Sequence, residues 1–264
     1  MSLSNDTSYE TLLLDIKDNI VVVTFNRDKD TNSFSRAMTL ELMGICHQLI
    51  KDGESDEPKY GTLVLTGGAG RSFSVGGDFC DVSQLDEEGA IREYLGEIID
   101  LYLSILKINI PVIAAIDNFA IGQGLQVALM TDWRMGTDNC RLQMPELKNG
   151  VACPLGSIIL EFLFGRAKML EFVLDCEFID AETSRNHCLL NQVVSAEELQ
   201  LSAFSLAQKY AAYPRSSFTT TKRIQNQRFI DAMESVREDS SKAHVAAFLK
   251  KEAKQHFDKI LGRD

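Results

Sequence analysis

Two glycine-rich turns, each directly after a short apolar run, constrain the fold of this sequence most. The run Thr62–Thr66 leads into a glycine-rich stretch at residues 67–78, and the run at residues 111–116 leads into a second turn at residues 122–124. An apolar helical pattern follows the second turn as far as Met130. Strands that alternate with helices in this way are typical of parallel sheets with helical crossovers. The sequence therefore predicts an α/β fold with a glycine turn after each of two buried strands.

The rest of the chain divides into a mixed part and a helical part. Ser35 is the expected N-cap of a helix that ends near Gly53, and its apolar stripe is Met38, Leu42, Ile45 and Leu49. We also expect a β-hairpin at residues 11–16 and 20–25, a helix at residues 87–107, and short strands at residues 133–136, 141–144 and 192–194. Helical patterns then fill residues 197–212, 216–236 and 243–260. The sequence therefore predicts a mixed core at residues 1–195 and a helical region at residues 196–264.

The composition is that of a globular protein with an acidic balance. The chain has 264 residues, 45% of them hydrophobic, and one main core is expected at this length. Its formal net charge is −11, from 27 Lys and Arg against 38 Asp and Glu, which argues against nucleic acid as a partner. The apolar run at residues 110–116 is far shorter than the ~20 residues of a membrane span, and the first ten residues have no secretory pattern. We expect no membrane association.

The cysteines and histidines give no metal or redox signal. The six cysteines are scattered without a CxxC pair, and the four histidines have no metal-ligand spacing relative to them. No histidine accompanies a serine or cysteine in a nucleophile motif. We therefore expect reduced thiols, no metal site and a cytoplasmic location.

The two glycine turns match no nucleotide-binding motif. The first contains Gly70-Arg71-Ser72, which lacks the spacing of a phosphate loop and of the G-x-S-x-G elbow. The second has Val127 where a dinucleotide fingerprint needs its third glycine. The alternative is that both turns point backbone N–H groups at one oxygen atom, as an oxyanion hole requires. Glu146 lies within 25 residues of the second turn and is the candidate acid–base group, although a lone Glu is most often a surface residue.

The C-terminal end of the chain is cationic. Its charges are Lys250, Lys251, Lys254, Lys259 and Arg263. A solvated helix face is the simpler interpretation, and binding of a phosphorylated ligand is the alternative.

Taken together, five segments resemble the crotonase (enoyl-CoA hydratase/isomerase) superfamily, from about Leu12 to Phe257. These segments are residues 64–79, 115–124, 131–134, 144–146 and 181–194. Each is a weak signal alone, whereas five in the right order and spacing are specific. The resemblance implies a crotonase-like spiral of ββα turns with a C-terminal helical region for trimerisation, and hence a homotrimer or a dimer of trimers.

The resemblance also implies an acyl-CoA thioester as the substrate. Coenzyme A is then part of the substrate, and no separate cofactor is needed. The backbone amides that polarise the thioester carbonyl would be those of Gly77 and Gln123. The neighbouring loop residues implied in substrate binding are Ser74, Gly76, Asp78 and Gly122. The implied contacts of the CoA phosphates are Arg27, Lys29 and, from a neighbouring subunit, Lys251.

The resemblance further implies which reaction is favoured. Hydratases of the family use two glutamates, of which one matches Glu146, while the other position is Gln126 here. Glutamine can orient water but cannot take its proton, so efficient hydration is disfavoured. One carboxylate suffices to move a proton from C2 to C4, which favours a Δ3-Δ2 enoyl-CoA isomerase. The alternatives are a weak hydratase, a family member that acts on an unusual acyl-CoA, a specialised decarboxylase of the same scaffold, and a non-catalytic acyl-CoA-binding protein.

Overall fold

The computed structural model describes residues 3–27, 29, 31–250, 257–259 and 261–263. Its larger sheet has six strands in the order β1-β2-β3-β4-β6-β9, and a smaller sheet has the order β5-β7-β8. The larger sheet consists of β1 (Leu12–Lys17), β2 (Ile20–Phe25), β3 (Thr62–Thr66), β4 (Val112–Ile116), β6 (Trp133–Thr137) and β9 (Gln192–Val194). The smaller one consists of β5 (Phe119–Ile121), β7 (Arg141–Gln143) and β8 (Ile179–Asp180). Only the hairpin β1–β2 is antiparallel in the larger sheet, which confirms the predicted α/β fold with parallel crossovers.

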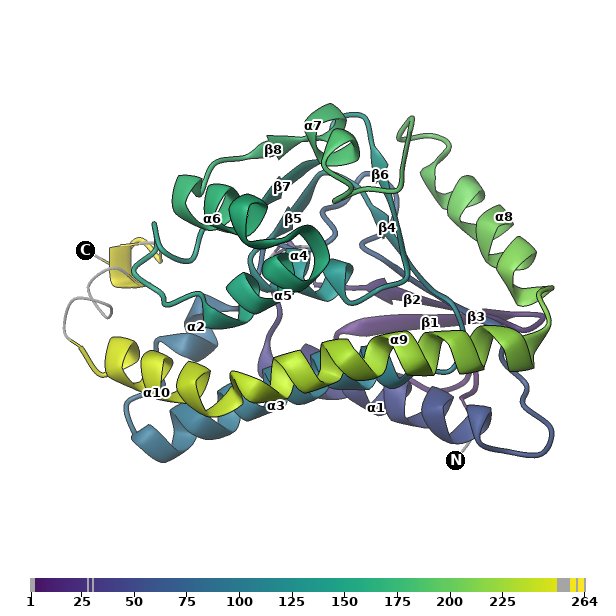
Figure 1. The fold of residues 1–264 in the computed structure, drawn as a ribbon, viewed down its shortest axis with the longest axis horizontal. Coiled ribbons are helices and arrows are strands. Elements are labelled where there is room, and N and C mark those ends of the chain that lie inside the picture. Colours follow the sequence, from purple (N-terminus) through teal and green to yellow (C-terminus); the bar gives the residue numbers. More distant parts are fainter. Residues whose placement is uncertain (1–2, 28, 30, 251–256, 260, 264) are drawn as a thin grey trace.

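Helices cover both faces of the larger sheet (Figure 1). They are α1 (Arg36–Gly53), α2 (Phe79–Val82), α3 (Glu88–Lys107), α4 (Gln123–Leu129), α5 (Pro154–Phe164), α6 (Arg166–Asp175), α7 (Ala181–Asn186), α8 (Leu199–Ala211), α9 (Arg215–Ser235) and α10 (Arg237–Phe248). In β3, Leu63 and Leu65 belong to the main core, whereas Val64 packs in a second core beneath α8. This alternation follows from the two-residue period of a strand and explains why β3 is apolar throughout.

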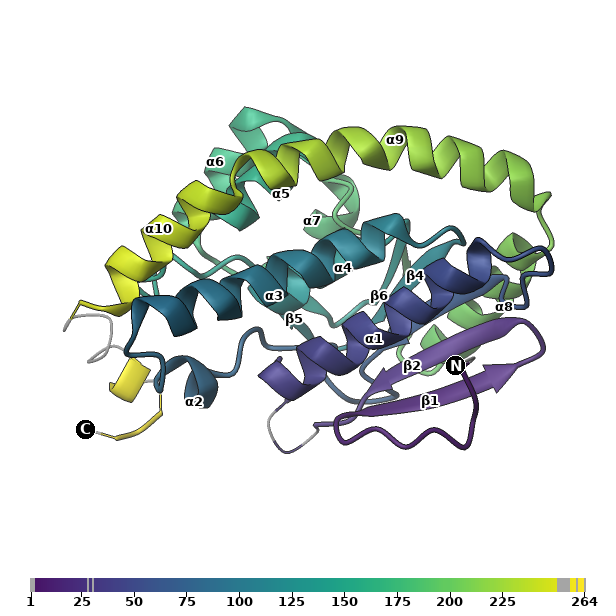
Figure 2. The same cartoon turned by 90° about the horizontal axis from the view of Figure 1, so that it is seen from below.

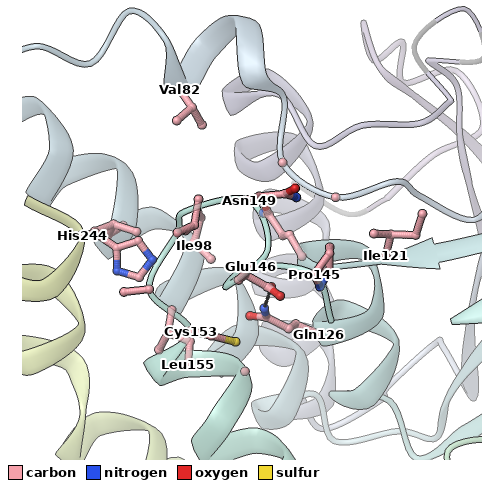
Figure 3. A pocket seen from close by; sticks show the side chains of 18 of the residues that line it. Val82, Ile98, Ile121, Gln126, Pro145, Glu146, Asn149, Cys153, Leu155 and His244 are labelled. Carbon is pink, nitrogen blue, oxygen red and sulfur yellow. Dashed lines mark hydrogen bonds between the residues drawn. The ribbon is translucent and has the colours of Figure 1, made fainter. Parts of the chain in front are cut away.

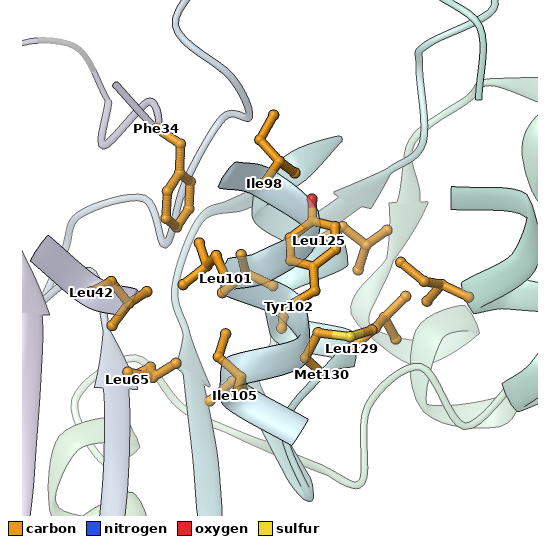
Figure 4. Packing of buried hydrophobic residues seen from close by; sticks show 14 of the residues in the cluster. Phe34, Leu42, Leu65, Ile98, Leu101, Tyr102, Ile105, Leu125, Leu129 and Met130 are labelled. Carbon is orange, nitrogen blue, oxygen red and sulfur yellow. The ribbon is translucent and has the colours of Figure 1, made fainter. Parts of the chain in front are cut away.

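The main core centres on α1 and α3. The Ser35 Oγ atom accepts a hydrogen bond from the Met38 amide, as predicted for the N-cap, and the predicted apolar stripe of α1 is buried. Figure 4 shows α3 side chains packed between those of α1 and those of α4, with Tyr102 in the middle. Tyr102 is fully buried, and its hydroxyl points toward the end of α4 that follows the second glycine turn.

The C-terminal helices pack on the mixed core. Figure 2 shows α3 lying between α1 and the pair α9–α10. The Lys222 ammonium on α9 pairs with Asp132 at 2.6 Å and also donates to the Ile110 carbonyl. These bonds attach α9 to the segment just before β4. The last helix was predicted to start at residue 243, and this start is wrong: α10 begins at Arg237, directly after a break at Val236. Trimer formation and the division at residue 195 stay predictions.

The region between residues 145 and 190 contains helices that the sequence patterns did not predict. The helix α5 is apolar on most of its circumference and begins with Pro154, and α6 begins after Gly165, whose φ is +80°. A helix without a polar face gives no amphipathic signal, which explains the omission. Among the described helices, none is long and apolar enough to cross a membrane.

Candidate active site

The two predicted loops lie against each other in the structure. The Ser74 amide donates to the Phe119 carbonyl at 3.0 Å, and the Ile121 amide donates to the Ser74 carbonyl at 2.9 Å. A side chain at Gly124 is excluded, because its Cβ would lie 2.5 Å from the Ser74 carbonyl oxygen. The glycine at this position therefore permits the close approach of the two loops.

Each loop presents to the cavity a backbone amide that donates to none of the described residues. Gly76 has φ +104° and Gly122 has φ +50°, conformations that favour glycine directly before Gly77 and Gln123. Within the described residues, the amide N–H groups of Gly77 and Gln123 donate to no protein atom. The Gln123 amide is also at the N-terminus of α4, where the helix leaves its first N–H groups unpaired. Two such donors at one cavity are what an oxyanion hole requires.

Glu146 lies at the same cavity, in the turn between β7 and α5. Its carbonyl accepts from the Val151 amide at 2.8 Å, which fixes the turn. Its Oε1 atom lies 3.4 Å from the place where a Cβ at Gly122 would stand, beside the second loop. Its Oε2 atom is shielded from solvent and has no hydrogen-bond partner among the described residues. The carboxyl therefore has one oxygen atom held by the protein and one available to a ligand.

Gln126 holds the first of these oxygen atoms. The Gln126 Nε2 atom donates to Glu146 Oε1 at 2.6 Å (Figure 3). The Tyr102 hydroxyl donates to Gln126 Oε1 at 3.0 Å. A hydroxyl that donates to one end of an amide identifies that end as the oxygen. Tyr102 therefore orients the amide so that its nitrogen atom faces the carboxyl of Glu146.

Burial raises the pKa of Glu146 to about 7. The backbone N–H of Glu146, the amide of Gln126 and the thiol of Cys153 act in the opposite direction by hydrogen bonding to the charged form. A carboxyl that titrates near neutrality can both take and return a proton at physiological pH, as general acid–base catalysis needs.

The cavity around these groups is mostly apolar. The lining comes from the first loop, α2, α3, the second loop, the turn after β7, the start of α5 and α10. Apolar or aromatic lining residues are Val75, Phe79, Val82, Leu95, Ile98, Ile121, Val151, Leu155 and Phe248. Figure 3 shows Ile98, Leu155 and His244 around the side of the cavity opposite Ile121. An apolar cavity with few polar groups suits an acyl chain next to a polar reacting centre.

Arg27 and Lys29, two of the predicted contacts of the CoA phosphates, do not line this cavity. The Arg27 guanidinium pairs with Asp78 at 2.7 Å, and Asp78 in turn caps α2 by accepting from the Cys80 amide. These contacts hold the first loop in place against β2 and α2. Lys29 is exposed just after β2, and Lys251 lies outside the described residues.

The sequence analysis did not identify several lining residues as site residues, among them Tyr94, Tyr102, Cys153 and His244. The two tyrosines lie on the predicted helix α3, where they are spaced as ordinary core positions. His244 donates from Nδ1 to the Ser240 carbonyl at 2.7 Å, since a carbonyl can only accept, and burial lowers its pKa. Its other ring nitrogen is thus a lone-pair acceptor. No metal-binding cluster of three His, Cys, Asp or Glu side chains occurs in the part of the chain that the structure describes.

Comparison with known proteins agrees with this geometry. Residues 15–261 match the enoyl-CoA hydratase/isomerase family. A carboxymethylproline synthase of Pectobacterium carotovorum subsp. carotovorum is 40% identical over 246 residues, which cover 93% of this chain and 96% of the relative. The structure of ThnE from S. clavuligerus is 31% identical, with a TM-score of 0.70 over 86% of this chain and 98% of that one.

A further solved structure is similar in fold. An enoyl-CoA hydratase/isomerase from Mycobacterium paratuberculosis has a TM-score of 0.86 over 96% of this chain and 100% of that one, at 23% identity. The family match spans almost the whole sequence, including both loops and Glu146. The chain belongs to the enoyl-CoA hydratase/isomerase family, the crotonase superfamily.

Proposed function

We propose that this protein forms the enolate of an acyl-CoA thioester and joins it to a carbon electrophile. The observation that carries the proposal is the pairing of one buried carboxyl, Glu146, with a neutral amide, Gln126, at 2.6 Å. Among the described residues, this arrangement supplies one carboxyl beside the cavity and an amide where a second carboxyl would stand. The 40% identical carboxymethylproline synthase supports a reaction that makes a carbon–carbon bond.

The first step is removal of a proton from the α-carbon of the thioester. That proton is too weakly acidic to leave unless the developing enolate oxygen is stabilised. One oxyanion donor contributes ~2.7–4 kcal/mol in other enzymes, so the amides of Gly77 and Gln123 supply a large share of the stabilisation. Glu146 accepts the α-proton through the carboxylate that lines the same cavity.

Efficient hydration of a double bond is disfavoured by the same residues. A second general base would stand at Gln126, whose amide is held on both sides by Tyr102 and Glu146. Loss of a general base typically lowers a rate by ~10²–10⁴-fold. We therefore expect hydration of crotonyl-CoA to be slow or absent.

The fate of the enolate follows from the chemistry of a carboxymethyl group on a proline ring. The enolate carbon bonds to the electrophilic carbon of a five-membered cyclic imine, and the electron pair of the C=N bond moves to nitrogen. That nitrogen takes up a proton, which the protonated Glu146 can return. Water then cleaves the thioester, releasing CoA and leaving the carboxymethyl group. The two carbon atoms of the new group thus come from C1 and C2 of the thioester, and the second oxygen atom of its carboxyl comes from water.

The second candidate is Δ3-Δ2 enoyl-CoA isomerisation, which a single carboxyl also favours. Glu146 would remove the C2 proton of a 3-enoyl-CoA and return it at C4. The apolar lining of the cavity is compatible with an unsaturated hydrocarbon chain. A non-catalytic acyl-CoA-binding role is disfavoured, because burial raises the pKa of Glu146 to the range that proton transfer needs.

Product analysis tests the proposal. Purified protein is incubated with acetyl-CoA or malonyl-CoA together with a pyrroline carboxylate, and separately with 3-hexenoyl-CoA and crotonyl-CoA. A carboxymethyl-substituted proline that is made from acetyl-CoA and is lost in Glu146→Gln supports the proposed reaction. Product from malonyl-CoA alone contradicts the proton-removal step, because that enolate forms by loss of CO2. Conversion of 3-hexenoyl-CoA alone supports the isomerase instead. Turnover of crotonyl-CoA alone, or binding without any turnover, contradicts both.

A further inference from the structure

We propose that the side chains of Gln123 and Tyr94 form a polar subsite that selects acyl groups with an oxygen acceptor on C3. This inference rests on the proposed acyl-CoA activity and names the substrates that the site prefers. It concerns the side chain of Gln123, whereas the oxyanion hole uses only its backbone amide.

The Gln123 carboxamide is buried without a partner. The residue is 8% exposed and lines the cavity, and its Nε2 atom is shielded from solvent with no hydrogen-bond partner among the described residues. The backbone N–H of the same residue is an oxyanion donor, so a bound thioester brings its acyl group next to this amide.

Tyr94 adds a second polar tip at the same place. A methyl group added at Gly77 would lie 3.3 Å from Gln123 Oε1 and 3.4 Å from the Tyr94 hydroxyl. The two polar side chains therefore flank the residue that offers the other oxyanion amide. Burial and the charges of Asp81, Asp78 and Glu97 raise the pKa of Tyr94, so its hydroxyl keeps its proton and remains a donor. Both groups are neutral: the Tyr94 hydroxyl is a donor, and the Gln123 carboxamide has its acceptor Oε1 near Gly77 and an unpartnered donor at Nε2.

Such a subsite discriminates mainly against hydrocarbon acyl groups. C1 of the acyl group is held by the oxyanion amides and C2 faces Glu146, so C3 is the first atom free to carry a recognised group. A hydrocarbon there leaves the buried amide unpaired, whereas an oxygen accepts its hydrogen bond. Leaving one buried donor unpaired weakens binding by about 10-fold. A keto oxygen and a carboxylate oxygen are both acceptors, and the test separates them.

Three acyl groups of nearly the same shape provide the test. Malonyl, acetoacetyl and isovaleryl groups each have a CH2 followed by a branched carbon, and they differ in whether that branch is a carboxylate, a ketone or a hydrocarbon. Dissociation constants of the three CoA thioesters are measured by calorimetry with Glu146→Gln protein, and mass spectrometry verifies that the thioesters stay intact. We expect at least one oxygen-bearing thioester to bind about 10-fold more tightly than isovaleryl-CoA. Preference for malonyl-CoA identifies a carboxylate ligand, and preference for acetoacetyl-CoA identifies a neutral one.

Variants in the same background identify the residues responsible. Gln123→Met keeps the backbone amide and the side-chain length but removes the carboxamide, and we expect the ratio of affinities to fall toward one. Tyr94→Phe should lower the ratio as well. Ile98→Val, an apolar change in the same cavity, is the control and should leave the ratio as it is. The subsite alone is overturned if the Glu146→Gln protein binds the three thioesters with equal affinity. It is also overturned if Gln123→Met leaves the ratio of affinities between the oxygen-bearing thioester and isovaleryl-CoA unaltered. Failure of all three thioesters to bind overturns the proposed function together with it.

Discussion

Replacing Gln126 with methionine isolates the effect of its amide on the charge state of Glu146. The two side chains have similar length, but methionine cannot donate the hydrogen bond that reaches Glu146 Oε1 at 2.6 Å. A hydrogen bond to a charged group contributes about 1.5–3 kcal/mol, and 1.36 kcal/mol corresponds to one pKa unit. Because the lost bond favours the ionised carboxylate, the pKa of Glu146 should rise from about 7 by about one to two units.

The pH dependence of turnover measures this change. Glu146 must be ionised to accept the α-proton, so the rising limb of kcat/KM against pH should move upward by about one to two units in Gln126→Met. Tyr102→Phe is the matched control, since it leaves the donating nitrogen in place and removes only the bond that orients the amide. The rising limb of kcat/KM for Tyr102→Phe should therefore move by less than that for Gln126→Met. An unaltered limb in a Gln126→Met protein with native near-ultraviolet circular dichroism refutes the role given to the amide.

Three further predictions concern stability and loop packing. Gly124→Ala should abolish turnover, because its Cβ would lie 2.5 Å from a carbonyl oxygen of the facing loop. Gly96→Ala, which has open space at its Cβ, is the control and should keep both activity and the urea midpoint. Equal activity of the two variants would contradict this packing. The raised pKa of Glu146 favours its neutral form in the fold, so its contribution to the free energy of unfolding should fall by about 3 kcal/mol as the pH rises from about 4.5 to 7. Urea titrations at pH 5 and pH 8 should show this fall as the difference between the unaltered protein and Glu146→Gln; the same pH dependence in both proteins would contradict it. Lys222→Met should destabilise the protein by about 3 kcal/mol, since it leaves Asp132 without its ammonium partner, and Lys222→Met/Asp132→Asn should recover part of that loss in the same assay.

Local patterns were sufficient for the elements that carry the two loops. The strands β3 and β4 have uninterrupted apolar runs, and each is followed by glycines that the backbone angles require, so both turns could be located from the sequence. The helix α1 was predictable from Ser35 and from a stripe at helical spacing. These features depend on residues that are neighbours in the chain.

The environment of Glu146 depends on residues that are distant in the chain. Tyr102 of α3 fixes the amide of Gln126, and His244 reaches the cavity from α10. No spacing rule relates these positions, because only the packing of α3 and α10 against the loops brings them together. Arg27 illustrates the same limit: the family resemblance implied a contact with the CoA phosphates, and no sequence pattern indicated that its guanidinium pairs with Asp78.

Hydrogen–deuterium exchange at the substrate tests the role of Glu146 most directly. Butyryl-CoA, which has no double bond and meets no electrophile, is incubated with the protein in D2O, and deuterium at its α-carbon is followed by mass spectrometry. We predict incorporation with the unaltered protein and none above background with Glu146→Gln. Equal incorporation by both proteins, or none by either while butyryl-CoA binds, would contradict the assignment of this carboxyl as the group that moves the α-proton.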